Sequence, residues 1–555
     1  MDEIRREIER AIKDCFSLEK IFVEISEVPE GVEGDYASNI AMKMAKEVKQ
    51  SPRTIAETLA GKLEERGIKA EVAGPGFLNI TLGNEVYKKV VREFCKDFSK
   101  KVARDEYKGK KVVTEFSDPN PFKVLHIGHF YTSVMGESIS RLIELAGGEV
   151  HRVNFGGDVG LHVAKTIFIL KNKNSLSFNI EDIAKAYIEG TKLYEEDEEA
   201  RRRVTELNKK IYQISERGEG KYEGLSAEDK RLAELYWRGR EVSYKYFVQF
   251  YERIGVKFEK FYPESSVVDL GREMVSKEFE QGVYEKSEGA IVFPGEKFGL
   301  HTRVFINKEG VPTYEAKDVG LIFTKDKDYQ FDESVVITGN EQSEYMKVVL
   351  KSVEQYAPEL VHKTKHITHG MVRLPGNQKM SSRKGNFVKA VDILDDVLEK
   401  TKNEVIALGA IKYAFLKYKI GGDIIFDAEE SVSMTGNSGV YLLYSAVRAG
   451  KIISAASDVS VDKESREFEY NEWEKKLIKK FMEYPEVLGE AVENLAPHLV
   501  ANFLFEIAQE FSRFYEHCRV VGDENETERL KLVKVFKEIM EHGLGLLGIV
   551  VPEEM

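Results

Sequence analysis

The segment 111–156 constrains the fold more than any other part of the chain. KVVTEFS at 111–117 is a β-branched run typical of a buried strand. A Pro- and Asn-rich turn, DPNPFK, follows, and a helical pattern then runs from about His126 to Ala146 and ends at two glycines. EVHRVNF continues as a second strand. Strand, crossover helix and strand predict a βαβ unit of a parallel, doubly wound sheet, whose ligands bind at the carboxyl ends of the strands.

Around this unit, the length of 555 residues predicts several domains, because one hydrophobic core rarely organises so long a chain. Residues 1–105 predict an N-terminal α+β module. Residues 106–385 predict an α/β domain with a charged helical insertion at about 171–260, after which AIVF, TRVFI and SVVITG are strand-like. Residues 386–555 predict a C-terminal all-α helical bundle. Its long amphipathic stretches are 389–418, 431–456, 473–494, 497–517 and 525–545.

Composition excludes several classes of protein. No stretch approaches the ~20 consecutive apolar residues of a membrane span, and MDEIRREIER lacks a secretory signal's apolar region, so we expect a cytoplasmic protein without membrane contact. A net charge of -13 argues against indiscriminate nucleic-acid binding, although it leaves room for a local basic face. Cys15, Cys95 and Cys518 lie far apart without CxxC spacing, so neither disulfides nor a zinc site are expected.

The sharpest local motif is His126-Ile127-Gly128-His129, at the start of the predicted helix. The two imidazoles share a helix face, Gly128 permits a close backbone approach, and a helix N-terminus attracts phosphate. The motif therefore predicts a nucleoside triphosphate cradle in which His126 and His129 donate to the charge developing on phosphorus. By itself the tetrapeptide also fits two satisfied surface histidines, and a metal site would need a third ligand nearby.

A second motif is a basic loop about 250 residues later, whose cations and hydroxyls suit a pyrophosphate leaving group. Its predicted functional residues are Lys379, Met380, Ser381, Arg383 and Lys384. Alone, such a loop is typical of a solvated basic turn. Together with HIGH, and in the same order, it closely resembles the two signatures of class I aminoacyl-tRNA synthetases. That resemblance implies a Rossmann-like catalytic domain, and Mg²⁺ bound with ATP rather than a protein-bound metal.

Over nearly its whole length the chain resembles the arginyl-tRNA synthetase family. EFSDPN and Lys123 stand where that family has Glu-x-Ser-x-Pro-Asn and a lysine before HIGH. NFGGDVG, YPES, VPTYEAKD and TGNEQ resemble its later catalytic segments, and GVYLLYSAVR, FSRFYEHCRV and LGLLGIVVPEEM its anticodon-binding domain. GDYASNIAMKMAKEVKQSPRTIAETL and GPGFLNITL resemble its N-terminal module. The resemblance implies arginine activation that requires bound tRNA.

An arginine pocket needs carboxylates and a π-face, because a guanidinium is always charged and presents a planar fork of donors. Glu264, Asp318 and Tyr314 fit those needs. By resemblance, Asn120 and Gln342 hold the substrate's α-amino group, and Glu115 lines the same pocket. Taken singly, each acid also fits a solvated surface position, as most Asp and Glu do.

Three positions depart from the family's pattern. Ser382 stands where the usual second lysine of K-M-S-K-S belongs, so we expect Arg383, Lys384 and, by resemblance, Lys123 to supply that charge. Val159 replaces a common tryptophan, which leaves the packing of its loop open. Tyr345 stands where a histidine is frequent, and we assign it no role.

The helical bundle is expected to read the anticodon by stacking and hydrogen bonds to splayed bases. The candidate contacts there are Tyr444, Arg448, Tyr515 and Met555, although core aromatics are as typical of the tyrosines. Resemblance makes Phe77, Asn79 and, more weakly, Asn39 candidates for contacting the tRNA D-loop corner.

The sequence therefore predicts an arginine–tRNA ligase, acting as a monomer on L-arginine, ATP and tRNA(Arg) and passing through arginyl-adenylate. Its enzyme rivals are a class I synthetase for cysteine, glutamate or lysine, and a smaller nucleotidyltransferase. The pocket acids and the terminal modules argue against the other synthetases, and a smaller nucleotidyltransferase would not need several hundred extra residues of helical bundle. A catalytically silent tRNA-binding paralogue is a further alternative, against which the intact His126, His129 and basic loop weigh.

Overall fold

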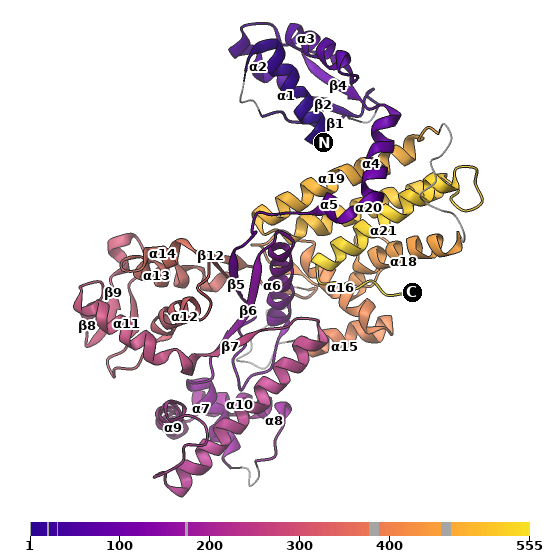
Figure 1. Cartoon of the computed structure of the whole chain (residues 1–555). Coiled ribbons are helices and arrows are strands. Elements are labelled where there is room, and N and C mark those ends of the chain that lie inside the picture. The colour runs from indigo at the N-terminus through magenta and orange to yellow at the C-terminus, as the bar shows by residue number, and fades with distance from the viewer. Residues whose placement is uncertain (1, 19–21, 30, 173–175, 377–387, 457–467) are drawn as a thin grey trace. The chain divides into compact units, whose positions relative to one another are not determined.

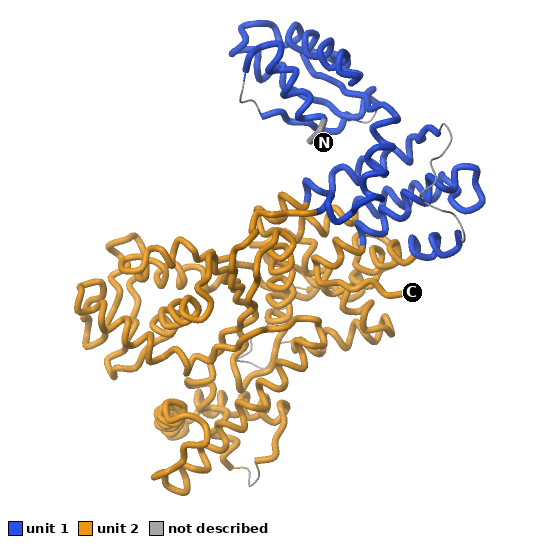
Figure 2. Tube along the Cα trace, viewed as in Figure 1, with its two compact units in different colours: residues 1–102, 448–487, 506–540 blue, residues 103–447, 488–505, 541–555 orange. Residues whose placement is uncertain are grey.

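A computed structural model of the chain describes residues 2–18, 22–29, 31–172, 176–376, 388–456 and 468–555 (Figure 1). The chain forms two compact units, drawn in different colours in Figure 2. Unit 1 comprises Met1–Val102, Arg448–Val487 and Glu506–Met540. Unit 2 comprises Ala103–Val447, Leu488–Phe505 and Glu541–Met555. The C-terminal helices therefore contribute residues to both units.

The centre of unit 2 is a five-stranded, wholly parallel sheet of order β12-β11-β5-β6-β7. Its strands are β5 (Lys111–Glu115), β6 (Glu149–Gly156), β7 (Lys260–Pro263), β11 (Glu333–Gly339) and β12 (Thr364–His369). The predicted βαβ unit is confirmed, since β5 and β6 pair in parallel on either side of α6 (Ile127–Leu145). Strand order reverses between β5 and β11, which is where doubly wound sheets bind ligands.

Helix α6 lies against this sheet and is buried along most of its length, as its apolar run leads one to expect. Gly136 allows the close approach, because a Cβ there would lie 2.1 Å from Cγ of Phe116, just after β5. On the apolar core of the sheet also pack residues of α11 (Val268–Glu280), α12 (Tyr314–Tyr329) and α13 (Ser343–Glu354), such as Val319 and Val349. The sheet is thus buried between helices, as its β-branched strands require.

The other strands of unit 2 form two small sheets. AIVF and TRVFI form β9 (Ala290–Phe293) and β10 (Arg303–Ile306), which pair antiparallel with each other, and β8 (Glu285–Ser287) completes that sheet. SVVITG instead belongs to β11 of the main sheet. The second small sheet pairs β13 (Val372–Arg373) with β14 (Ile424–Ile425). Short helices between these segments are η1 (Glu264–Ser266), η2 (Gly295–Phe298), η3 (Asn340–Gln342) and α14 (Pro358–His362).

The predicted helical insertion is present and begins earlier than about 171. It consists of α7 (Leu161–Leu170), α8 (Ile180–Glu196), α9 (Glu198–Arg217) and α10 (Ala227–Arg253), which share an apolar core. Val159 is fully buried in that core, so the smaller side chain at this departure from the family's pattern is packed. The preceding Asp158 accepts hydrogen bonds from Ser265 and Tyr236, which ties the insertion to the end of β7.

The C-terminal third is helical, as predicted, with two differences. The helix expected at 431–456 begins at Gly439, and a second expected helix is divided. The stretch 389–418 forms two helices, because Lys402 adopts a left-handed conformation and Asn403 then caps the second helix by accepting from Val405 N and Ile406 N. The helices are α15 (Ala390–Thr401), α16 (Glu404–Leu416), α17 (Ala428–Ser431), α18 (Gly439–Ala455), α19 (Glu472–Asn494), α20 (Pro497–His517) and α21 (Glu526–Leu546).

Unit 1 contains an α+β module in which helices pack on a four-stranded antiparallel sheet of order β1-β2-β4-β3. The strands are β1 (Ser26–Glu27), β2 (Tyr36–Ser38), β3 (Lys69–Ala73) and β4 (Phe77–Thr81). The helices are α1 (Asp2–Phe16), α2 (Ile40–Val48), α3 (Pro52–Glu65), α4 (Asn84–Lys96) and α5 (Phe98–Val102).

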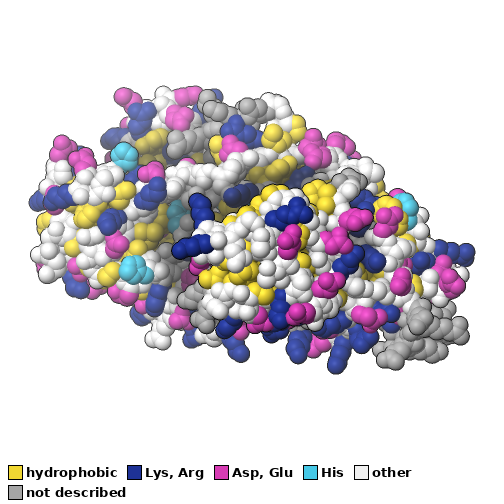
Figure 3. Space-filling model, turned by 90° about the horizontal axis from the view of Figure 1, so that it is seen from above, with side chains coloured by type: hydrophobic (Ala, Val, Ile, Leu, Met, Phe, Trp, Pro, Cys, Tyr) yellow, Lys and Arg dark blue, Asp and Glu magenta, His cyan; other side chains and the backbone are white. Residues whose placement is uncertain are grey.

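The surface carries charges of both signs. Figure 3 shows acidic and basic side chains interspersed across the viewed face, with hydrophobic side chains between them. Among the described residues, no helix combines the length and apolar character needed to cross a membrane.

The close contact at Gly136 gives a test of the packing of α6. Gly136→Ala should lower the free energy of unfolding by about 1–3 kcal/mol, because the new methyl group overlaps Phe116. Gly545→Ala is the matched control, since Gly545 also lies in a helix and a Cβ there meets nothing within 4 Å. The control should be neutral or slightly stabilising. Equal denaturant midpoints for the two variants would contradict the packing.

Candidate active site

A cavity of about 840 Å³ in unit 2 opens at the carboxyl ends of β5, β11 and β12. It brings together residues that are more than 200 positions apart in sequence. Nine of the residues singled out from the sequence line it: Glu115, Asn120, His126, Gly128, His129, Glu264, Tyr314, Asp318 and Gln342.

A reciprocal cap fixes the two histidines of HIGH at the N-terminus of α6. His126 is the N-cap residue, and its Nδ1 accepts from Gly128 N at 3.1 Å. Nδ1 of His129 accepts in turn from His126 N at 3.2 Å. The imidazoles face each other with ring centroids 3.8 Å apart. Two backbone N–H groups of the helix end are thereby satisfied, and both rings are held in one orientation.

The protonation of these rings follows from the same contacts. Burial, with Lys123 nearby, lowers the pKa of His126 to about 4, and burial and the neighbouring His126 also lower the pKa of His129. Both imidazoles are therefore neutral near pH 7. Because each Nδ1 accepts a hydrogen bond, each proton is on Nε2. The site thus offers two neutral N–H donors at a helix N-terminus, an arrangement suited to phosphate oxygens.

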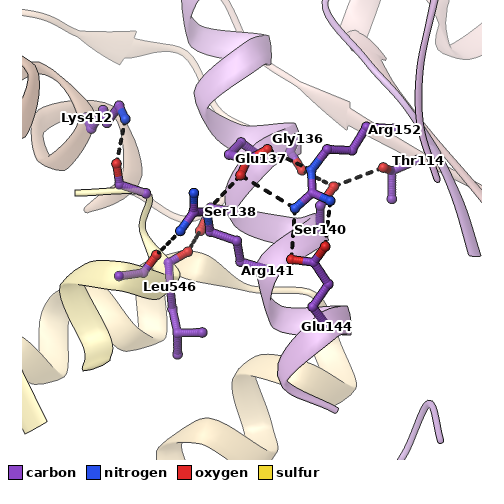
Figure 4. Close-up of polar contacts among 12 residues, drawn as sticks. Thr114, Gly136, Glu137, Ser138, Ser140, Arg141, Glu144, Arg152, Lys412 and Leu546 are labelled. Atoms are coloured by element: carbon purple, nitrogen blue, oxygen red, sulfur yellow. Dashed lines mark hydrogen bonds and ion pairs between the residues drawn. The ribbon is translucent and has the colours of Figure 1, made fainter. Parts of the chain in front are cut away.

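Ion pairs around the buried carboxylate of Glu137 fix the rest of α6 (Figure 4). Glu137 pairs with Arg141 at 2.7 Å and with Arg152 of β6 at 2.8 Å, and Arg152 also pairs with Glu144 at 2.6 Å. The helix that carries HIGH is therefore bonded along its length to the strand beside β5.

Helix α6 also holds the C-terminal end of α21. Three side chains donate to backbone carbonyls there: Arg141 to Gly545, Ser138 to Leu546 and Lys412 of α16 to Gly548 (Figure 4). Carbonyls at a helix C-terminus lack partners within the helix, and cations are favoured beside them. Burial lowers the pKa of Lys412 to about 8, because the charged amine is removed from water. The hydrogen bond to its backbone partner holds the buried amine in place.

Two of the predicted pocket acids have lysine partners. Glu115 pairs with Lys325 of α12, which also donates to Ser334 at 3.2 Å, and both members of the pair are buried. Glu264 pairs with Lys317 of the same helix at 2.7 Å. Both carboxylates are thus neutralised from within the chain, which the sequence did not reveal.

Asp318 has a hydroxyl partner instead of a cation. The hydroxyl of Tyr345 donates to its carboxylate, and Arg303 lies over the Tyr345 ring with its guanidinium carbon 5.3 Å from the ring centroid. Burial raises the pKa of Asp318 to about 7, while the hydrogen bond from Tyr345 opposes the rise. Tyr345, to which the sequence assigned no role, therefore orients the pocket acid and favours its charged form.

Tyr314 and Asn120 flank these acids. Tyr314 lies one helical turn before Asp318 and is 59% exposed, and the amine of Lys317 lies 4.9 Å from its ring centroid. Oδ1 of Asn120 accepts from Gly157 N at 2.8 Å, which fixes the amide at the cavity wall. Gln342 ends η3, just after β11.

The end of β12 is tied to α6 through His369, which the sequence analysis did not single out. Its Nε2 lies 2.8 Å from Oγ1 of Thr132, and its Nδ1 donates to its neighbour Gly370 O at 2.8 Å. A Cβ at Gly370 would lie 2.2 Å from Gly422, so this glycine permits a close backbone contact at the cavity edge. Only a strand predicted at 364–369 would have pointed to these residues, and the sequence did not indicate a strand there.

Lys123 lies beside the main cavity rather than in it. It lines a small adjoining pocket of about 70 Å³ together with Asn120, His126 and His129, and its amine lies 5.2 Å from the Tyr187 ring centroid. The predicted residues of the basic loop, Lys379, Met380, Ser381, Arg383 and Lys384, lie outside the described residues.

The tRNA candidates of unit 1 differ in exposure. Phe77 is 39% exposed at the start of β4, whereas Asn79 is buried and its amide donates to Glu33 O at 3.0 Å. Arg448 lies over the ring of Tyr515, 3.7 Å from the centroid. This stacked pair on α18 and α20 presents a cation and an aromatic ring together.

The remaining tRNA candidates are dispersed. Asn39 precedes α2, and its buried Oδ1 has no hydrogen-bond partner among the described residues. Tyr444 is partly exposed on α18, and Met555 is the last residue of unit 2. The structure places none of these three in the cavity.

A doubly wound sheet with the HIGH histidines at its switch point defines a class I aminoacyl-tRNA synthetase. The family model "tRNA synthetases class I (R), catalytic domain" matches residues 94–412, more than half of the chain. Models of the arginyl tRNA synthetase N terminal domain and of the DALR anticodon binding domain match residues 2–82 and 442–555. The chain belongs to the arginyl-tRNA synthetase family and is an aminoacyl-tRNA ligase.

Individual relatives agree over the full length. The chain is 28% identical to the arginine–tRNA ligase of Borrelia hermsii, covering 98% of this chain and 96% of that protein. It is 27% identical to that of Clostridium perfringens, with both chains fully covered. The arginyl-tRNA synthetase structure from Thermus thermophilus matches with a TM-score of 0.77 and 22% identity over 100% of both chains, which supports the fold.

The raised pKa of Asp318 predicts the pH dependence of arginine use. Asp318 should bind a guanidinium only when ionised, so kcat/KM for arginine should rise as pH passes through about 7 and fall below it. Tyr345→Phe removes the hydrogen bond that favours the carboxylate, so the profile should move to higher pH. Glu115, Glu264 and Lys325 also act on Asp318 and remain unchanged in this variant. Identical profiles for both proteins would contradict the assignment.

Proposed function

We propose that the cavity of unit 2 carries out the arginine–tRNA ligase reaction of this chain in two steps. L-Arginine and ATP first give arginyl-adenylate and pyrophosphate, and the arginyl group then passes to the terminal ribose of tRNA(Arg). One observation carries this proposal. The reciprocal cap presents two neutral Nε2–H donors of HIGH at a cavity whose carboxylates could bind a guanidinium.

In the activation step, the α-carboxylate of arginine attacks the α-phosphate of ATP, and pyrophosphate leaves. His126 and His129 would donate to the phosphate oxygens as negative charge develops there, aided by the N–H groups at the start of α6. Mg²⁺ would accompany ATP and offset triphosphate charge. Lys123 and the basic residues Lys379, Arg383 and Lys384, with Met380 and Ser381, are proposed to attract the leaving pyrophosphate.

The adenosine part of ATP is proposed to lie at the ends of β11 and β12. Gly339, Gly370 and Met371 line the cavity there. Glycines without side chains leave room for a planar base and a ribose beside α6.

Arginine is proposed to lie between this nucleotide site and α12. Asp318 and Tyr314 would contact the guanidinium, since one supplies charge and the other a π-face. Asn120 and Gln342 would hold the α-amino group at the other end of the substrate. Glu115 and Glu264 line the same pocket, where their lysine partners set how much charge they offer.

For tRNA, we propose that residues 1–105 contact the D-loop corner through Phe77, Asn79 and Asn39, and that residues 386–555 read the anticodon. The stacked Arg448 and Tyr515, with Tyr444 and Met555, are the proposed anticodon contacts. Residues 106–385 form the proposed catalytic domain. The enzyme is proposed to act as a monomer in the cytoplasm, where translation uses its product.

Aminoacylation with each amino acid in turn tests the reaction. Arginine alone should be charged to total tRNA, and ATP–pyrophosphate exchange should require tRNA. Charging of lysine, cysteine or glutamate would mean that the pocket has been assigned to the wrong substrate. Tight tRNA binding without any charging would favour a silent paralogue.

Replacing a HIGH histidine tests the donor role. His129→Ala should lower the rate of adenylate formation by about 100-fold or more, because a donor to the transition state is lost, while tRNA affinity stays nearly unchanged. His126→Asn is an informative companion, since asparagine also caps helices and would preserve α6 while altering the donor. Equal loss of adenylate formation and tRNA binding in His129→Ala would contradict this role.

A further inference from the structure

Most of the acidic side chains that line the cavity have a basic partner, and the few without one indicate where a cationic ligand could bind. Four of them pair with basic residues: Glu115 with Lys325, Glu264 with Lys317, Glu315 with Arg303, and Asp423 with Arg373. Among the described residues, no ion pair reaches Asp118, Asp318 or Glu341. Glu341 is exposed, whereas Asp118 and Asp318 are half-buried at the cavity wall.

The backbone of the DPNPFK turn aims Asp118 into the cavity wall. Asp118 has a left-handed conformation with φ 46°, directly after Ser117 at φ 74°. Its Oδ1 accepts from Phe155 N at 2.9 Å, which fixes the carboxylate at the end of β6. No described residue donates to its second oxygen, which leaves one oxygen for a ligand.

Asp118 also lies within electrostatic reach of the pocket acids. Burial and the nearby charge of Glu115 raise the pKa of Asp118 well above its usual value, and Asp318 adds to the rise while Lys325 opposes it. The charge of Lys325 therefore acts on both aspartates, although Lys325 pairs directly only with Glu115. Carboxylates crowded in a partly buried site are stable in the charged form only beside further positive charge.

A guanidinium is the cation that fits this arrangement. Its five N–H donors lie in one plane, so a single group can bridge two carboxylates, which a lysine ammonium does less well. Glu264 is already held by Lys317, and Glu115 by Lys325. Asp318 and Asp118 remain as the half-buried cavity carboxylates that lack such a partner, whereas the unpaired Glu341 is exposed.

We propose that Asp118 is a specificity-determining residue that binds the guanidinium of arginine together with Asp318. This rests on the proposed use of the cavity for arginine. The inference goes beyond the family's motif, because Asp118 occupies an unspecified position of Glu-x-Ser-x-Pro-Asn. Lys317 and Lys325 complete the arrangement by confining the uncompensated negative charge to these two aspartates.

Asp118→Asn is the decisive variant. Asparagine keeps an oxygen for Phe155 N and tolerates a left-handed backbone, while the charge is lost and the second oxygen becomes an NH2 donor that cannot accept from a guanidinium. KM for arginine in aminoacylation should rise by about tenfold or more, the loss typical of a charged hydrogen bond. KM for ATP and for tRNA, and the thermal unfolding midpoint, should stay within about twofold or a few degrees of the wild type.

Asp118→Gly separates binding from bracing, because glycine accepts the positive φ but removes both the charge and the acceptor for Phe155 N. A raised KM for arginine in both variants supports the proposal. A normal KM in Asp118→Asn with a defect in Asp118→Gly would show that Asp118 only braces its loop and would overturn the proposal. Equal rises in KM for arginine, ATP and tRNA would overturn it too. Failure of the wild type to charge arginine would instead overturn the proposed function.

Discussion

The reciprocal cap at the start of α6 is the interaction on which the site depends. His126 and His129 each use Nδ1 to hold a backbone N–H of the helix end, so the groups that begin the helix are the same groups that face the cavity. The cap fixes ring orientation and tautomer together. Burial then keeps both rings neutral, which makes them donors without placing two positive charges side by side.

The position of α6 depends in turn on close packing and buried charge. Gly136 lets the helix approach Phe116, and the pairs of Glu137 with Arg141 and Arg152 join it to the sheet. Arg141 also donates to Gly545 at the end of α21. One helix therefore carries the proposed phosphate donors at its start and holds the C-terminal segment of unit 2 along its body.

Charge balance organises the other half of the cavity. Buried carboxylates recognise a cation well, but unpaired ones are unfavourable in a low-dielectric interior. Lysines of α12 resolve this for Glu115 and Glu264, while Asp318 receives a hydroxyl from Tyr345. Helix α12 thus supplies both the acid proposed to bind substrate and the cations that limit how much negative charge the pocket holds.

The sequence by itself determined the βαβ unit, the helical C-terminal third and the residues of the HIGH motif, because hydrophobic periodicity and turn residues act locally. Only the tertiary structure decided the charge partners. Glu115 and Lys325 are 210 positions apart, and Glu264 and Lys317 are 53 apart, so no local pattern links them. The broken helix at Lys402 and the strand ending at His369 were likewise decided by capping and by sheet pairing. Long-range contacts set which acids stay free for a ligand.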